Sequence, residues 1–114
     1  MSDFLKFTND YINKIREDEI CKEYFRQKEI VTTQYPDLKK QIDEFRYRNY
    51  KLQNETDADR LFDETDRFER EYEEFCKNPI VSDFLAAELA FCRMYQEIQS
   101  VLGEAFAKDF DLSN

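Results

Sequence analysis

Apolar side chains recur every three or four residues along most of the chain, which is the spacing of amphipathic α-helices. This pattern predicts five helices. The first runs from a cap at Ser2 or Asp3 to about Arg16, and the second follows a cap at Asp18. The predicted apolar faces of these two helices are Phe4, Phe7 or Thr8, Tyr11, Ile12 and Ile15, then Ile20, Tyr24, Phe25 and Val31.

Two prolines mark the starts of later helices. A residue before proline is pushed out of the α region, so the second helix is expected to end near Tyr35 and the third to begin at Pro36. A fourth helix follows the polar segment 54–59 and continues through Phe75. The fifth begins at Pro79 and its pattern continues to about Lys108, after which we expect the polar tail to fray.

The fifth helix predicts self-association. About 30 residues make a helix of about 45 Å, whereas a compact domain of this size is roughly 34 Å across. The protruding end would carry apolar residues, so we expect a homodimer. The alternatives are that helix one folds over this end, or that the last helix is kinked at Gly103. The expected core and dimer positions are Phe84, Phe91, Met94, Ile98, Val101, Leu102 and Phe106.

Composition supports an all-α fold and excludes several kinds of site. The 114 residues include one glycine and no histidine, so neither the tight turns of a sheet fold nor a glycine-rich phosphate loop is expected. Imidazole catalysis and histidine metal ligands are excluded. We therefore predict a single domain, 1–114, with five helices in an antiparallel arrangement and a long C-terminal helix.

Charge and hydropathy limit the expected partners. The formal net charge is −9, which opposes binding of the whole surface to nucleic acid or anionic membranes. No segment approaches 18 consecutive apolar residues, and the N-terminus lacks an apolar signal region. We expect a cytoplasmic protein without membrane insertion.

One local feature favours nucleic-acid binding, in contrast to the net charge. The third predicted helix is basic and interleaves cations with tyrosines, an arrangement that can stack on unpaired RNA bases. The alternative is that these aromatic residues pack in a hairpin or dimer. This strip, a candidate partner or RNA surface, consists of Lys39, Arg46, Tyr47, Arg48, Tyr50 and Lys51.

Isolated polar residues offer weaker candidates. Glu88 falls in the apolar pattern of the fifth helix, so it is expected in a buried ion pair, with Arg46 or Arg48 as partner, or in partner binding. Three dispersed cysteines, Cys21, Cys76 and Cys92, are expected to be small buried thiols rather than iron–sulfur ligands. The carboxylates at 57–66 are expected to be a solvated helix start rather than a cation site.

Two segments carry a resemblance to a known family. Residues 35–53 and 78–106 resemble the YlbF/YmcA family of bacterial proteins. Its pattern is a proline-initiated helix with P-[DE]-L and I-x-[DE]-F, then N-P-x-V-x-x-[FY]-L-x-A-E at the start of a long final helix. The matching residues are Pro36, Asp37, Leu38, Ile42, Glu44 and Phe45, then Asn78, Pro79, Val81, Phe84, Leu85, Ala87 and Glu88.

The resemblance implies a small cytosolic helical protein that self-associates and has no catalytic activity. Some members regulate competence, sporulation and biofilm formation in a complex linked to the ribonuclease RNase Y. One branch has a Cys-rich C-terminal extension associated with iron–sulfur binding; this sequence ends in DFDLSN, so it resembles the short members and no cofactor is expected.

The expected function is therefore that of a non-enzymatic regulatory adaptor. Its expected partners are a second copy of the chain and other regulatory proteins of the same family. An RNA-associated factor that uses the basic strip is the alternative.

Overall fold

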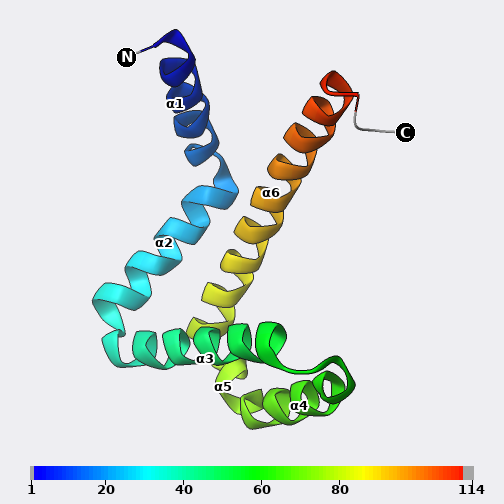
Figure 1. The fold of residues 1–114 in the computed structure, drawn as a ribbon. Helices are drawn as coiled ribbons and strands as arrows, with labels where there is room; N and C mark the ends of the chain where they lie inside the picture. The colour runs from blue at the N-terminus through cyan, green and yellow to red at the C-terminus, as the bar shows by residue number, and fades with distance from the viewer. Residues whose placement is uncertain (1, 112–114) are drawn as a thin grey trace. The chain divides into compact units, whose positions relative to one another are not determined.

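The computed structural model describes residues 2–111, and its regular elements in that range are six α-helices (Figure 1). The predicted all-α fold and long C-terminal helix are confirmed. Residues 112–114 of the tail that we expected to fray lie outside the described residues. The helices are α1 (Asp3–Arg16), α2 (Glu19–Gln34), α3 (Pro36–Glu55), α4 (Ala58–Glu71), α5 (Glu73–Lys77) and α6 (Pro79–Asp109).

Local capping chemistry explains where the helices begin. The Ser2 Oγ accepts a hydrogen bond from the backbone N–H of Leu5 at 3.3 Å, which satisfies one free donor of the first turn. Pro36 and Pro79 are the first residues of α3 and α6, as predicted. The Asn78 Oδ1 accepts a first-turn N–H of α6 at 2.9 Å. These starts depend on neighbouring residues alone, so the sequence pattern locates them.

The predicted number of five helices is wrong, because the fourth predicted helix is divided at Tyr72. The helix α4 ends at Glu71 and α5 begins at Glu73, while Tyr72 has φ −101° and ψ 10°. The Tyr72 ring lies edge-on to Phe45 with the centroids 5.0 Å apart, and its hydroxyl accepts a hydrogen bond from Arg48. These contacts with α3 hold the residue away from ideal helical geometry.

The described residues group into two compact units. The first unit contains 2–26 and 86–111, and the second contains Gln27–Leu85. Both α2 and α6 therefore contribute residues to each unit.

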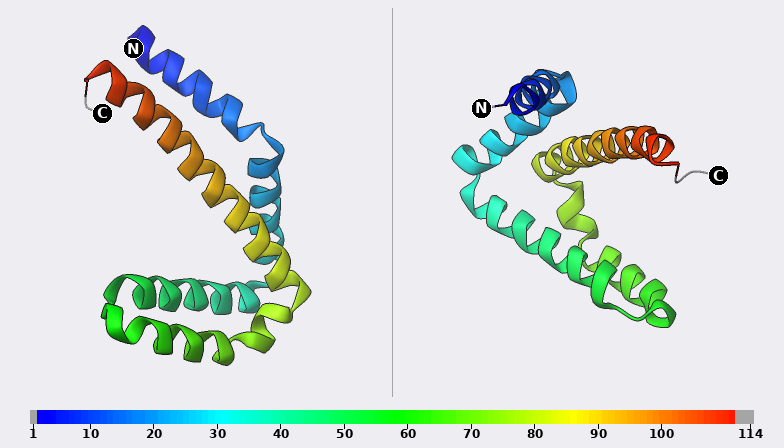
Figure 2. Two further views of the ribbon diagram at one scale, coloured as in Figure 1. Left: turned by 90° about the vertical axis from the view of Figure 1, so that its right-hand side faces the viewer. Right: turned by 45° about the horizontal axis from the view of Figure 1, so that its top comes forward.

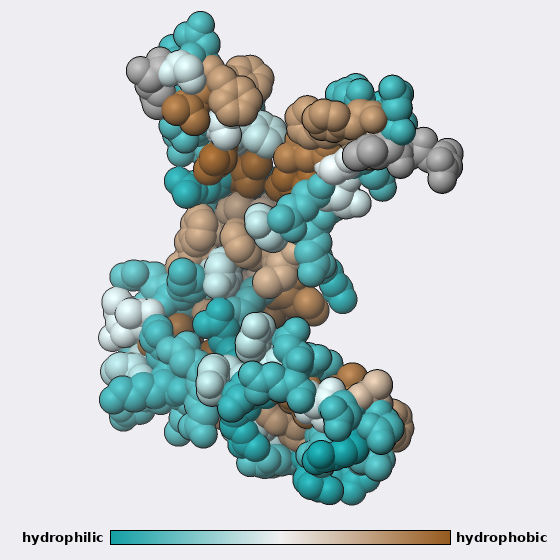
Figure 3. Space-filling model, viewed as in Figure 1, coloured by the Kyte–Doolittle hydropathy of each residue, from teal (hydrophilic) through white to brown (hydrophobic). Residues whose placement is uncertain are grey.

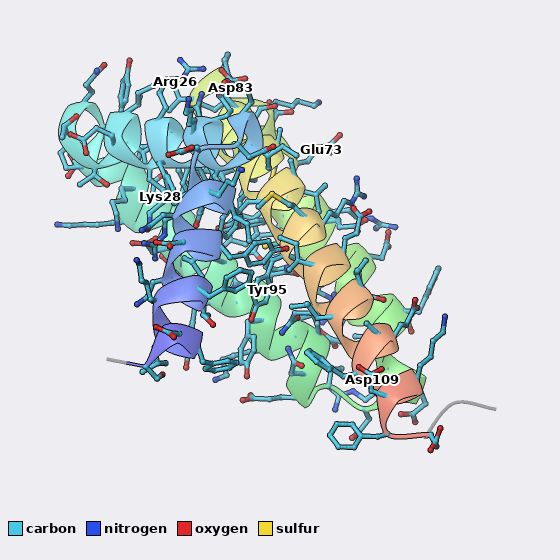
Figure 4. The ribbon with its side chains drawn as sticks, turned by 90° about the horizontal axis from the view of Figure 1, so that it is seen from above. Arg26, Lys28, Glu73, Asp83, Tyr95 and Asp109 are labelled. Carbon is cyan, nitrogen blue, oxygen red and sulfur yellow. The ribbon has the colours of Figure 1, made fainter. Side chains whose placement is uncertain are left out.

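An aromatic contact between α2 and α6 forms the packed part of the first unit. The Tyr24 ring stacks on Phe91 with the centroids 4.6 Å apart, and Phe25 lies 6.1 Å from the same ring. Beyond this contact α6 continues through Tyr95 to Asp109, both labelled in Figure 4 and both exposed. The helix α1 has no buried residue. The core of this unit is therefore confined to one end of its α6 segment.

An antiparallel hairpin dominates the second unit. Figures 1 and 2 show α3 and α4 lying side by side, as expected for helices joined by a short connection. Their shared interior is aromatic: the Phe45 ring stacks on Phe68 with the centroids 5.3 Å apart, and it also lies 5.9 Å from the Phe75 ring of α5. A separate aliphatic and aromatic cluster in the same unit is fully or almost fully buried and consists of Val31, Ile42, Val81 and Phe84.

Candidate functional site

Apolar side chains of the first unit remain exposed on two helices. Phe7 of α1 is 78% exposed, and Phe106 of α6 is 57% exposed. Brown atoms gather over α1 and over the C-terminal part of α6 in Figure 3. We define the unit 1 apolar surface as the following exposed residues of these two helices: Phe4, Phe7, Tyr11, Ile12, Val101, Leu102 and Phe106.

The predicted interface residues of α6 divide into a packed part and an exposed part. Phe84 is buried in the second unit, and Phe91 is stacked on Tyr24 in the first. Met94 and Ile98 are half-buried. The remaining three, Val101, Leu102 and Phe106, are exposed, so α1 does not cover this end of α6. No kink forms at Gly103, because α6 is one helix from Pro79 to Asp109.

The interface prediction omitted α1, although its pattern already contained the signal. Phe4, Phe7, Tyr11 and Ile12 recur at helical spacing on a face that buries nothing within the chain. An amphipathic helix usually buries its apolar face against a partner. The large apolar side chains exposed on α1 and on the C-terminal part of α6 are therefore candidates for contact with another molecule.

An ion pair connects the two helices of the hairpin. The Arg48 guanidinium donates to both carboxylate oxygens of Glu71, at 2.8 and 3.0 Å, and to the Tyr72 hydroxyl at 2.7 Å. Its carbon centre lies 5.1 Å from the Tyr72 ring centroid and 5.7 Å from that of Phe68. Arg48 therefore joins α3 to α4 through a two-bond pair, the geometry in which arginine binds carboxylates best.

This pair predicts a loss of stability in acid. The hydrogen bonds from Arg48 lower the pKa of Glu71 below its usual 4.5. A depressed pKa stabilises the fold above the unfolded-state pKa, and that contribution is lost as the pH falls through the folded-state pKa. We expect the melting temperature of Glu71→Gln to fall less steeply than that of the wild-type protein as the pH decreases below about 4.5, as measured by circular dichroism. Glu74→Gln, at a highly exposed carboxylate of α5, should keep the wild-type profile; equal profiles for both variants would contradict the prediction.

The basic strip is divided among several local contacts. Arg48 points to α4, whereas Lys39 and Arg46 both pair with Asp43, at 2.6 and 3.4 Å. Lys51 lies 3.9 Å from a carboxylate oxygen of Glu55 and 5.5 Å from the Tyr47 ring centroid. The two tyrosines of the strip are exposed. The structure thus leaves both rings accessible and places a carboxylate beside each of the four cations.

The remaining polar candidates are Glu88, the three cysteines and the carboxylates at 57–66. Glu88 is half-buried, and the ion pair predicted for it stays a prediction. Burial raises the pKa of the Cys21 and Cys76 thiols, the first of which is fully enclosed. Cys92 is exposed, so the expectation of three buried thiols is wrong at that position. Across residues 2–111, no three His, Cys, Asp or Glu side chains lie together in a metal-binding group.

No helix among the described residues combines the length and the apolarity needed to cross a membrane.

Comparison with known proteins assigns the chain to a family. The family model described as "Control of competence regulator ComK, YlbF/YmcA" matches residues 8–106, which is most of the chain. No curated protein and no solved structure matches this chain. The match covers α2, α3, α4 and α5 in full and most of α1 and α6, together with both proline-initiated helix starts. The family is a regulatory family rather than an enzyme family, and this chain belongs to the YlbF/YmcA family.

Proposed function

We propose that this protein is a non-enzymatic regulatory adaptor that acts by binding other proteins, and that it forms a homodimer through the unit 1 apolar surface. The observation that supports this proposal is the exposure of large apolar side chains on α1 and on the C-terminal part of α6. Such a surface loses contact with water when a second copy covers it, and burial of apolar area is the main driving force of association. Two-fold pairing is the commonest way in which identical chains achieve this.

The regulatory part of the proposal comes from the family. Members are described by control of the competence regulator ComK. We extend that role to this chain, with competence, sporulation or biofilm regulation and RNase Y-dependent mRNA processing as the processes in which the adaptor acts. Other regulatory proteins of the same family are its proposed partners.

Sedimentation equilibrium tests the proposed homodimer. At micromolar concentration the full chain is expected to show a mass near twice the 13.9 kDa of the monomer. A mass equal to that of the monomer across the accessible concentration range would overturn the self-association part of the proposal.

A direct binding measurement tests the adaptor against an RNA-binding role. We expect a labelled single-stranded RNA to show no anisotropy change with this protein at physiological salt, because the net charge is −9 and carboxylates pair with most of the strip. Binding that weakens steeply with salt and disappears in the variant Arg46→Glu/Lys51→Glu would contradict the adaptor. Both substituted side chains are exposed, so this variant should keep the fold.

A further inference from the structure

The α3–α4 hairpin has two different faces. On one face the Arg48–Glu71 pair lines a cavity of about 440 Å³, whose lining also contains the cations Lys51 and Arg67. On the other face α3 presents Phe45, Asn49 and Gln53, which are spaced by four residues and so lie in one row. Among the described residues, no ion pair joins α3 to α4 on this second face. The aromatic interior of the hairpin reaches the surface there.

This second face is hollowed by two adjoining cavities of about 350 and 470 Å³. Both are lined by Gln53, Thr65 and Glu69, so they form one groove along the hairpin. Phe45, Phe68 and Tyr72 line one end, and Leu61 and Phe62 line the other; we call this surface the hairpin groove.

Two side chains show that the groove is suited to binding. Phe62 is 81% exposed, although it borders a groove that is lined by other apolar groups. Cys76, at the opposite end, has a thiol whose pKa is raised by burial, so it stays neutral and adds to the apolar lining. An aromatic side chain exposed beside an apolar groove is a typical anchor of a protein interface.

The polar rim of the groove is acidic. Asp66, Glu69 and Glu73 line it, and among the residues that the structure describes no lysine or arginine does. Asp66 pairs with Arg70 at 2.7 Å and Glu73 with Lys77 at 3.5 Å along their own helices. Glu69, which lines both cavities, has no ion-pair partner within 2–111. Glu73 is labelled in Figure 4, at the start of α5.

We propose that the hairpin groove binds a basic amphipathic helix of a partner protein. The partner's apolar face would cover Phe62 and the aromatic lining, and lysine or arginine side chains beside that face would pair with Glu69 and its acidic neighbours. Along α4, from Ala58 to Glu71, the groove accommodates a partner helix of about 14 residues, or about 21 Å. A partner with a basic surface fits better than a second copy of this chain, because each copy carries a net charge of −9.

This inference rests on the proposed adaptor function and specifies one of its partners by chemistry. A direct test uses the full chain and three synthetic 14-residue peptides. The first is an amphipathic Leu/Lys helix, the second replaces each Lys with Glu, and the third contains the residues of the first in a non-amphipathic order. Isothermal titration at about 0.15 M salt is expected to show binding of the first peptide at least tenfold tighter than of the other two. Equal binding of all three would overturn the proposal.

Two variants with matched controls locate the binding. Phe62→Ser and Glu69→Lys should each weaken binding of the Leu/Lys peptide by tenfold or more. Phe110→Ser removes a phenylalanine of the first unit that is 72% exposed, and Glu97→Lys reverses an exposed carboxylate on α6. These controls should change the affinity less than twofold. Losses as large in the controls as in the groove variants would mean non-specific attraction to an acidic protein and would overturn the proposal.

Sedimentation of the same variants separates this inference from the proposed homodimer. Phe62→Ser should keep the mass of the wild-type protein. A fall from dimer to monomer would show that a second copy occupies the groove, which contradicts a basic partner. Specific peptide binding by a wild-type protein that sediments as a monomer would support the groove while overturning the homodimer.

Discussion

Ile42→Ala is expected to lower the free energy of unfolding by about 2–5 kcal/mol, the cost of removing a large aliphatic side chain from a packed core. Ile42 is 0% exposed. It also borders a small cavity of about 60 Å³ together with Val31 and Phe84, so truncation enlarges an existing void. A loss of this size is a large part of the stability of a small domain. The melting temperature should fall by on the order of 10–25 °C.

Chemical denaturation of two further variants provides the controls. Ile42→Val removes one methylene and should cost only about 0.5–1.5 kcal/mol. Ile20→Ala makes the same substitution at a position that is 39% exposed, and it should cost less than half as much as Ile42→Ala. If Ile20→Ala proved as destabilising as Ile42→Ala, the cluster of Val31, Ile42, Val81 and Phe84 would not be the core of the second unit.

The helix starts were predictable because each depends on short-range chemistry. Ser2 caps α1 with its own hydroxyl, and Pro36 and Pro79 fix the backbone angle of a first helical residue. None of these features requires knowledge of distant contacts. The length of α6 was predictable for a similar reason, since an apolar pattern without a proline continues from residue 80 to its end.

The break at Tyr72 was not predictable, because its cause lies on another helix. The local pattern through Phe68, Tyr72 and Phe75 is that of an uninterrupted helix. The hydrogen bond from Arg48 and the edge-on contact with Phe45 come from α3, twenty or more residues earlier. Tertiary contacts outweigh local propensity at such a position.

The candidate surfaces were predictable only in part. The sequence pattern placed Val101, Leu102 and Phe106 on an apolar stripe, but the same stripe included Phe84, which the second unit buries. Periodicity identifies an apolar face without showing which part of it the chain itself covers. The hairpin groove was missed for a related reason: its lining comes from two helices, and Glu69 was one acidic residue among many until α3 was placed beside it.

Phe106→Asp is expected to convert the homodimer to monomers. Phe106 is exposed within the chain, so its replacement should change the free energy of unfolding of the monomer by no more than about 0.5 kcal/mol. In a dimer that buries the unit 1 apolar surface, the same change removes an aromatic contact and introduces a charge into an apolar interface. A loss of 2 kcal/mol or more, typical of a central aromatic residue, weakens association at least about 30-fold.

A matched variant on the same helix makes this result specific. Ser100→Asp adds the same carboxylate to an exposed position about 120° around α6 from Phe106, given about 100° per residue. It should leave the sedimentation mass near twice 13.9 kDa at the concentration at which Phe106→Asp sediments as a monomer. If both variants dissociate together, added negative charge rather than loss of the apolar contact separates the copies. If neither does, the copies associate through a surface that excludes the C-terminal part of α6. Dissociation in Phe106→Asp alone identifies the apolar stripe of α6 as the contact that holds the dimer.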